Sequence, residues 1–400
     1  MWVAQWVTVL GFGFAFPFLP LFIQQDLGIP EPARAALWSG IASGFMGIAM
    51  FLFGPIWGMI GDRYGRKKNV LRAMFGGAIF LAATGLSANV FHLIVLRTLN
   101  GMASGVFATV MALVSSTTPR ERIPLSMGAL QSAMLLGNTV GPLIGSVLAG
   151  TVGFRGAYFV AGGMVAIAAT LVFLFARDDF ERPKEPGSLF RHDALAGLFH
   201  LVSSREVAPI LATVLLVQMA PVLMFPVLPV LLESMIPGSG TLGTGISFAI
   251  LGITGALAAY STGWLGSRIR ITHMLAIACV GAGVFYIPLA FAQTVLPMFI
   301  TLAFAGMFQG ILLGSTSGLL AMVLPPEQRS TGFGALQSVS AGAFGFGPLI
   351  GGTIASIAGL RSVFLVQAAV LFIASVLVVR LLGGRESGQS GDTSVEATAS

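Results

Sequence analysis

Long stretches with almost no charge divide this chain, and they limit what it can fold into. Only 9% of the 400 residues are charged and 56% are hydrophobic, against roughly 25% charged in an ordinary soluble domain. A helix of about 20 apolar residues crosses a bilayer. The sequence predicts twelve such membrane spans, at 2–24, 37–60, 70–89, 91–115, 124–150, 155–176, 207–232, 243–265, 272–292, 295–322, 331–357 and 361–382.

The apolar runs are continuous and do not alternate in ten-residue segments, which excludes a β-barrel and predicts an all-α integral membrane protein. The one cysteine, Cys279, falls inside a span and leaves no disulfide framework. No cleavable signal pattern is found. The first span begins at residue 2 without a basic flank, so a start upstream of Met1 stays open.

The position of the cations predicts the orientation in the membrane. Of the 21 Lys and Arg residues, 17 fall in or beside the even-numbered loops, the central loop and the C-terminal end, whereas Arg34, Arg155 and Arg361 fall on the other side. Basic loops stay cytoplasmic. The protein is therefore expected in a bacterial-type inner membrane with both termini cytoplasmic, and its net charge of +6 indicates topology and not a nucleic-acid partner.

An internal repeat organises the chain. The pentapeptide GPLIG occurs at 141–145 and again at 347–351, and a shift of 206 residues aligns the flanking sequence without a gap from Pro119 to Arg155. A weaker echo joins FPFLP at 16–20 to FPVLP at 225–229. Two parallel six-helix bundles, related by a pseudo-two-fold axis along the membrane normal, would hold a substrate near the midplane between them. The predicted parts are a bundle at 1–176, a cytoplasmic linker at 177–206, a second bundle at 207–383 and a disordered cytoplasmic tail at 384–400.

This plan resembles the major facilitator superfamily in everything but the tail, and the segment GMIGDRYGRKK carries the most specific match. It fits the superfamily's loop 2–3 signature at Gly58, Asp62, Arg63, Gly65, Arg66 and Lys67. The resemblance implies a charge-relay latch that holds the cytoplasmic side shut in the outward-facing state. A plain positive-inside anchor is the alternative, and it explains the cations but neither Asp62 nor the glycines. The matching loop of the second half carries Ser267 in place of the aspartate.

Arg97 lies about seven residues inside its span, or roughly 10 Å deep at about 1.5 Å per residue. An intramembrane arginine is a functional hypothesis by default because a buried cation is costly. It matches the superfamily's motif in this helix, with Gly101 in place and Asn100 where glutamine is usual. The resemblance to drug exporters links it to proton transfer. The alternative is an arginine that snorkels to the outer headgroups or bonds the backbone of the first helix.

The repeated pentapeptide predicts two bare helix faces. Glycines at four-residue spacing let helix backbones approach closely in lipid, and the prolines add a bend. The first copy matches the superfamily's antiporter motif. In superfamily members, span 5 packs on span 8 and span 11 packs on span 2. The resemblance thus implies an interbundle pivot associated with export; the alternative is a generic packing face. The expected pivot residues are Gly137, Gly141, Pro142, Gly145, Gly347, Pro348 and Gly351.

The first span, LGFGFAFPFLP, follows the pattern of twelve-helix drug:proton antiporters at Leu10, Gly11, Pro17 and Pro20. An ordinary kinked span is the alternative. No acidic residue falls near the middle of any predicted span, since Asp26 and Glu233 lie at span ends. A cavity with Arg97 and no carboxylate suits neutral or anionic compounds better than cations. Its expected lining is Gln131, Gln337, Gln218, Gln309, Phe12, Phe16, Phe225 and Met134, although helix packing would use the same side chains.

The sequence thus predicts a monomeric secondary transporter that exports small lipophilic neutral or anionic compounds by alternating access, in exchange for protons. Membrane lipid and a small-molecule substrate are the expected partners, and no cofactor beyond the proton gradient is expected. The proton-coupling candidates are Asp62, Arg97, Asp26 and Glu233, while uncoupled export stays open. The alternatives are a sugar or siderophore exporter and a non-transporting sensor or scaffold. No nucleophile–base pair or metal-spaced cluster is found, so an enzyme is not expected.

Overall fold

The computed structural model describes residues 1–119, 122–176, 208–266, 268–323 and 329–396, and the regular elements within these ranges are all α-helices. The predicted linker at 177–206 lies outside them. The first half contains α1 (Trp2–Ala15), α2 (Leu19–Gln25), α3 (Pro32–Tyr64), α4 (Arg66–Thr84), α5 (Val90–Ala103), α6 (Val106–Thr117) and α7 (Ile123–Phe175). The second half contains α9 (Ala208–Val222), α10 (Leu228–Met235), α11 (Gly240–Gly266), α12 (Ile271–Phe291), α13 (Val295–Val323), α14 (Arg329–Ala358) and α15 (Ser362–Glu396).

These helices fall on all twelve predicted spans, although several spans are broken or fused. Among the described residues, 8 helices are long and apolar enough to cross a membrane by themselves, and Val90–Ala103 and Ile210–Val222 are shorter apolar helices. The chain is thus a multi-pass integral membrane protein. The count of twelve stays a prediction, because short helices such as α5 and α6 or α9 and α10 would have to share one crossing.

Prolines explain two of the breaks. A proline lacks the N–H that a helix interior needs, and its ring clashes with the preceding turn. Pro17 lies between α1 and α2, and Pro226 lies between α9 and α10. These two sites are the repeated FPxLP segments, so the breaks are duplicated with the chain. The third break, between α5 and α6, has Gly105 at φ 106, in the left-handed region that favours glycine.

One residue joins spans 5 and 6. Gly153 has φ 75 and ψ 168, the only non-helical conformation inside α7. Positive φ is available to glycine without the steric cost that other residues meet. The sequence predicts a loop at this point, and the structure replaces it with a single glycine joint between two helical arms.

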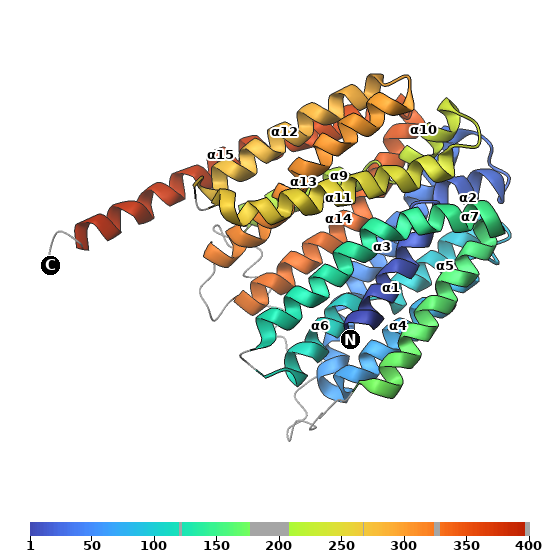
Figure 1. Cartoon of the computed structure of the whole chain (residues 1–400), viewed down its shortest axis with the longest axis horizontal. Helices are drawn as coiled ribbons and strands as arrows, with labels where there is room; N and C mark the ends of the chain where they lie inside the picture. The colour runs from blue at the N-terminus through green and yellow to red at the C-terminus, as the bar shows by residue number, and fades with distance from the viewer. Residues whose placement is uncertain (120–121, 177–207, 267, 324–328, 397–400) are drawn as a thin grey trace.

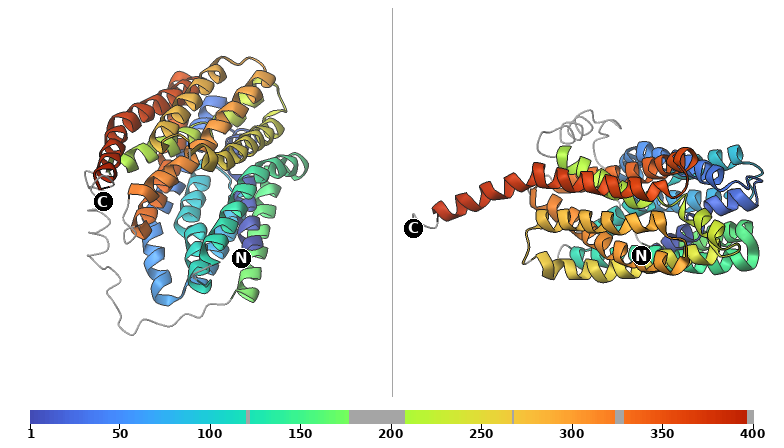
Figure 2. Two further views of the ribbon diagram at one scale, coloured as in Figure 1. Left: turned by 60° about the vertical axis from the view of Figure 1, so that its left-hand side comes forward. Right: turned by 90° about the horizontal axis from the view of Figure 1, so that it is seen from above.

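The last helix is longer than expected. α15 continues as helix to Glu396 and projects away from the bundle (Figures 1 and 2), whereas the sequence predicts a disordered tail from residue 384. A helix satisfies its own backbone hydrogen bonds without neighbours, and no proline interrupts residues 362–396.

The two halves meet along two helix pairs. α3 packs on α14 and α7 packs on α11, which confirms the packing of span 2 on span 11 and of span 5 on span 8. Within the halves, α1 packs on α7 and α9 packs on α14. The halves also touch where α10 contacts α2 and α3, at one end of the bundle (Figure 1). The basic-loop rule predicts that this α2–α10 end faces outside.

Candidate functional site

Four phenylalanines from both halves pack together where broken helices meet. Phe16 follows the end of α1, and Phe225 lies in the turn between α9 and α10. Their ring centroids are 5.6 Å apart and edge-on. Phe344 of α14 lies 6.2 Å from each of them, and Phe248 of α11 lies 5.1 Å from Phe225. We call these four residues the aromatic cluster.

The aromatic cluster is a product of the duplication. Phe16 and Phe225 begin the two FPxLP segments, so the same proline break presents a ring from each half. In transporters built from repeats, substrate sites lie between the repeats, commonly beside discontinuous helices. The aromatic cluster is therefore the best candidate for one wall of the central site.

Arg97 lies directly behind this cluster. It is 1% exposed within α5, and its guanidinium carbon lies 5.2 Å from the centre of the Phe16 ring. Its Nε and Nη2 atoms find no hydrogen-bond partner among the described residues. A side chain buried to this degree does not snorkel to the headgroups. The face of the Phe16 ring gives the guanidinium a cation–π contact where these two nitrogens lack hydrogen bonds. The structure thus holds a cation beneath an aromatic cover.

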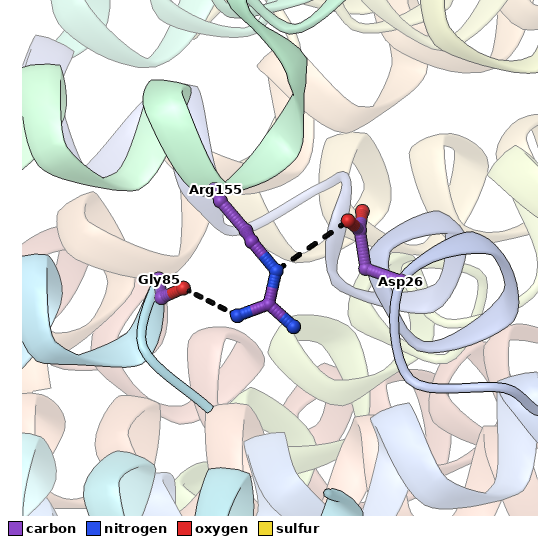
Figure 3. A network of polar contacts seen from close by, with 3 residues as sticks. All are labelled: Asp26, Gly85 and Arg155. Atoms are coloured by element: carbon purple, nitrogen blue, oxygen red, sulfur yellow. Dashed lines mark hydrogen bonds and ion pairs between the residues drawn. The ribbon is translucent and has the colours of Figure 1, made fainter. Parts of the chain in front are cut away.

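The described carboxylates are engaged elsewhere. Asp26 Oδ1 lies 3.6 Å from Arg155 Nε, and Arg155 Nη1 donates to the carbonyl of Gly85 at 2.9 Å (Figure 3). Glu233 accepts hydrogen bonds from the backbone N–H groups of Gly238 at 2.9 Å and Gly240 at 2.8 Å. Both acids lie at the α2–α10 end, as predicted. Neither pairs with Arg97.

Tyr158 of α7 is 2% exposed, and its ring packs edge-on against Phe22 of α2 with 5.2 Å between the ring centroids. One tyrosine in an apolar span carries no pattern that would mark it in the sequence. Its position becomes visible only when α2, α5 and α7 are placed together.

The loop signature folds as two helices joined by one residue. α3 ends at Tyr64, Gly65 adopts φ 111, and α4 begins at Arg66. Lys67 Nζ donates to the carbonyl of Phe173 in α7 at 2.8 Å, so this cation is used inside its own half. The guanidinium of Arg63 lies 5.6 Å from the ring of Tyr64.

Gly58, one part of the predicted latch, is not closely packed. A Cβ added at Gly58 would meet no atom within 4 Å, so close packing does not require this glycine. The tight approach occurs at Gly61, where an added Cβ would lie 2.6 Å from Asn69 Nδ2. The side chain of Asp62 lies outside the described part of the chain, so the latch role stays a prediction.

The glycine ridge of the pentapeptide faces inward, which corrects the pivot assignment. A Cβ at Gly141 would lie 3.1 Å from Gly13 Cα, and one at Gly145 would lie 2.7 Å from Phe14 Cα, both on α1. Gly137 likewise faces Val9, 2.7 Å away. In the second half, Gly347 and Gly351 face Val222 and Leu223 around the end of α9. The spacing identifies a bare face correctly, but that face meets a helix of the same half.

A neighbouring face of each helix makes the contact between halves. A Cβ at Gly245 of α11 would lie 2.5 Å from Ser146 Oγ and 2.9 Å from the carbonyl of Pro142, and one at Gly252 would meet Thr139. On the other side, Gly40 of α3 faces the carbonyl of Pro348. The carbonyls of Pro142 and Pro348 therefore face the other half, and their role in a pivot stays a prediction. The described residues that make these close contacts across the two seams include Thr139, Pro142 and Ser146 of α7, Gly245 and Gly252 of α11, Gly40, Gly44 and Gly47 of α3, and Gly345, Pro348 and Gly352 of α14.

The structure describes the side chains of five of the other six predicted cavity residues. Gln218 Nε2 donates to Ser340 Oγ at 3.2 Å, and Gln309 Oε1 accepts from the Tyr286 hydroxyl at 3.4 Å, so both are bonded within the second half. Phe12 packs on Gly77 of α4 in the first half. Three remain: Gln131 is exposed, Met134 is half-buried, and the side chain of Gln337 is outside the described residues.

A cavity of about 460 Å³ lies at the α2–α10 end, lined in part by Asp26, Phe154 and Arg155. Another of about 350 Å³ lies beside α12, lined in part by Gly281 and Phe308. None of the predicted lining residues borders either cavity. The halves are in contact at the aromatic cluster in this structure, and there the rings pack on one another.

Sequence reasoning missed Phe248, Phe344 and Arg72. The two phenylalanines have no partner in the repeat that would mark them. The sequence does carry a signal for Arg72, because it falls inside the predicted span 70–89 as Arg97 falls inside its own. The basic loop residues that directly precede Arg72 hide this signal.

The model of the family described as Major Facilitator Superfamily matches this sequence in two overlapping segments, residues 1–300 and 274–400. The chain belongs to the Major Facilitator Superfamily. It is 28% identical over 388 residues to "Multidrug resistance protein MdtG" of Enterobacter lignolyticus (strain SCF1), covering 94% of this chain and 89% of that protein. It is 30% identical over 376 residues to the MdtG protein of Dickeya zeae (strain Ech586), covering 93% and 91%.

A solved transporter structure shares the fold. The crystal structure of the POT family transporter PepTSo superposes with a TM-score of 0.78 at 11% identity, covering 96% of this chain and 97% of that one. Membership of the superfamily explains the duplicated bundles, the broken helices and the loop signature as parts of one architecture.

Proposed function

We propose that this superfamily member is a secondary transporter that exports small, lipophilic, neutral or anionic compounds from the cytoplasm of a bacterial-type cell. The observation that carries the proposal is the aromatic cluster with Arg97 beneath it, formed where two broken helices of different halves meet. The names of the relatives, which are multidrug resistance proteins, support export of drug-like compounds. The protein acts as a monomer in the inner membrane with both termini cytoplasmic, uses no cofactor and is not an enzyme.

Alternating access follows from the contacts between the halves. At the α2–α10 end, Phe16 meets Phe225 and α10 meets α2 and α3, so this arrangement closes the predicted outer side. Opening that side requires Phe16 to leave Phe225 and Phe344. The ring that covers Arg97 is therefore the ring that must move, which links exposure of the cation to opening of the chamber.

The charge of the substrate follows from the charge of the site. A buried cation without a hydrogen-bonded carboxylate disfavours a second cation in low dielectric. A neutral aromatic compound can stack against the phenylalanines, and an anion can also pair with Arg97. Organic cations should be the poorest substrates of the three classes.

Purified protein in liposomes with an imposed proton gradient tests this order. Chloramphenicol (neutral), carboxyfluorescein (anionic) and ethidium (cationic) are the probes. We expect gradient-driven movement of the first two that a protonophore abolishes. Arg97→Gln should lower carboxyfluorescein transport by about tenfold or more while chloramphenicol transport changes less. Selective movement of ethidium would overturn the substrate class, and movement of no probe would remove the support for multidrug export.

Proton coupling is proposed to involve Arg97 and Asp62, with Asp26 and Glu233 as weaker candidates. Both oxygens of Glu233 are bonded to backbone amides, and Asp26 is paired with Arg155. These bonds favour structural roles for the two acids. If the double variant Asp26→Asn with Glu233→Gln keeps gradient-driven transport, both drop out, and loss of the gradient dependence in Asp62→Asn would then support Asp62.

A further inference from the structure

The break between α5 and α6 is held by side chains of two other helices. α5 ends at Ala103, and Gly105 with φ 106 precedes α6. The last carbonyls of a helix have no partner within it, and in the membrane such groups must find one elsewhere. Here the carbonyl of Gly101 accepts from the backbone N–H of Ser104 at 3.1 Å. The next three carbonyls need donors from outside the helix.

Those three carbonyls are satisfied one by one. Trp57 Nε1, from α3, donates to the carbonyl of Met102 at 2.6 Å. Arg72, from α4, donates through Nη1 to the carbonyl of Ala103 at 3.1 Å and through Nη2 to that of Ser104 at 3.3 Å. The guanidinium also places a positive charge at the negative end of the α5 dipole, which stabilises this arrangement.

The donors are fixed to one another. The guanidinium carbon of Arg72 lies 3.5 Å from the centre of the Trp57 ring, a stacked cation–π geometry. Arg72 Nε donates to Asn69 Oδ1 at 3.1 Å, and Asn69 Nδ2 donates to the carbonyl of Trp57 at 2.7 Å. Each of the three side chains therefore bonds or stacks on another member. We call Trp57, Asn69 and Arg72 the α5 cap.

The α5 cap is attached to the loop signature. Trp57 directly precedes Gly58, and Asn69 follows Lys67 by two residues. The ends of α3 and α4 that carry the signature thus reach the break in the chain between α5 and α6. In the second half, the corresponding span is α13, which runs from Val295 to Val323 as one helix.

We propose that the α5 cap holds a hinge at Ser104–Gly105, so that α6 moves with the signature-bearing ends of α3 and α4 while α5 keeps Arg97 in place. Arg72 is a positioning residue: its planar guanidinium bridges two carbonyls while it stacks on Trp57, a combination that the compact ammonium of a lysine does not reproduce. The role in transport rests on the proposed function. The hinge itself does not, because it follows from the contacts alone.

Spin-label distances between α5 and α6 test the hinge without any substrate. Val95 and Ser115 are exposed, so labels at Val95→Cys and Ser115→Cys in a Cys279→Ala background report the angle across the break. Arg72→Gln removes the guanidinium that bonds the carbonyls of Ala103 and Ser104. Trp57→Phe removes only the Nε1 donor to the carbonyl of Met102. Gly105→Ala acts on the backbone alone, because its Cβ would meet no atom within 4 Å but would sit at positive φ.

Two variants serve as matched controls. Gly163→Ala adds a methyl group in the α7 helix where an added Cβ also meets nothing within 4 Å, and it has no positive φ. Arg34→Gln removes an exposed arginine whose Nε lies 3.5 Å from Glu31. Both should leave the distance distribution as it is in the parent.

We expect a single narrow distance in the parent protein, a broader distribution in Arg72→Gln and a smaller broadening in Trp57→Phe. Gly105→Ala should shift the distance to a longer value as the segment straightens. In liposomes, Arg72→Gln should lower the maximal rate of chloramphenicol transport by about fivefold and change KM by less than about twofold, because the aromatic cluster and Arg97 are left unchanged. Arg72→Lys should recover only part of the rate.

Unchanged distances in both Arg72→Gln and Gly105→Ala would overturn the hinge. Equal broadening in Gly163→Ala would also overturn it, since the effect would then not belong to the break. If Arg72→Gln does not yield folded protein, Trp57→Phe and Gly105→Ala decide the question. A parent protein that moves no probe, with distances that respond as expected, would contradict the proposed function and leave the hinge standing.

Discussion

The two seams between the halves are built from repeat-related positions but are closed in different ways. α14 presents Gly345 and Gly352 to α3, whereas α7 presents Thr139 and Ser146 at the corresponding positions to α11. Glycine faces glycine in the first seam: a Cβ at Gly352 would lie 2.6 Å from the carbonyl oxygen of Ala36 and 3.2 Å from Gly40 Cα. In the second seam, small side chains fill the space beside the glycines of α11.

The difference indicates which seam can adjust. In the α3–α14 seam, backbone touches backbone, so a change of angle must move a whole helix. In the α7–α11 seam, the contact atoms include the hydroxyls of Thr139 and Ser146, which bond to their own helix at 2.8 Å and 2.6 Å. These side chains can change rotamer while the helices stay in place. The duplicated fold therefore has one stiff seam and one adaptable seam.

Gly47→Ala tests the stiff seam and should have the largest effect. An added Cβ would overlap the backbone of Gly345, so the halves could no longer close at this point. We expect transport to fall by about tenfold or more in liposomes, with the protein still folded. Gly342→Ala, on the facing helix, adds a Cβ that meets nothing within 4 Å and should keep the parental rate. Normal transport by Gly47→Ala would show that this seam need not close tightly.

Gly141→Ala tests whether the pentapeptide belongs to a seam or to the interior of a half. Its Cβ would lie 3.1 Å from Gly13 Cα and 3.2 Å from the carbonyl of Leu10. Overpacking of this kind costs about 1–3 kcal/mol, so thermal unfolding should occur at a lower temperature. Because the contact lies within one half, the folded fraction should transport at the parental rate. A lost rate with unchanged thermal stability would restore the pivot assignment.

Gly245→Ala tests the adaptable seam and should be milder. The new methyl group would crowd Ser146 Oγ, which a rotamer change can relieve in part. We expect transport to fall by about threefold. Adding Ser146→Gly, which gives α7 the residue that α14 has at this position, should restore most of the rate. A double variant no better than Gly245→Ala alone would contradict the account of this seam.

Asp26→Asn should have the smallest effect. Arg155 donates to the carbonyl of Gly85 at 2.9 Å, and its repeat mate Arg361 donates to the carbonyl of Ala290 at 3.3 Å. Arg155 also forms an ion pair with Asp26. The side chains are 41% and 29% exposed, so solvent screens the pair and its loss should cost no more than about 1 kcal/mol. Thermal unfolding measures this. A loss of thermal stability as large as that expected for Gly141→Ala would show that the Asp26 carboxylate does more than pair with Arg155.

The sequence predicts where the helices lie along the chain, but it does not predict which face of each helix packs on which neighbour. Hydropathy locates the spans and the internal repeat locates the two halves, because both signals can be read along the chain without knowledge of tertiary contacts. The four-residue glycine spacing identified a bare face on α7 and α14 but not its partner, since close approach looks the same against α1 as against α11. Only the packing distinguishes Gly141 from Ser146.

The site shows the same limit. Phe16 and Phe225 are both among the predicted lining residues, whereas Phe344 and Tyr158 join the site only through tertiary packing. Arg72 illustrates a different failure: a basic loop hides a cation that belongs to a span. The latch carboxylate of Asp62 and the amide of Gln337 stay predictions, because their side chains lie outside the described residues.

The single glycine between the two arms of α7 has a mechanical consequence. Gly153 is the whole connection between the arm that borders α11 and the arm that carries Arg155 and Tyr158. A glycine has two soft backbone torsions, so the angle between the arms can change at Gly153 while each arm stays helical. Rotation of the first arm at the adaptable seam can therefore be absorbed at this joint, and the arm that carries Arg155 and Tyr158 can keep its packing in the first half.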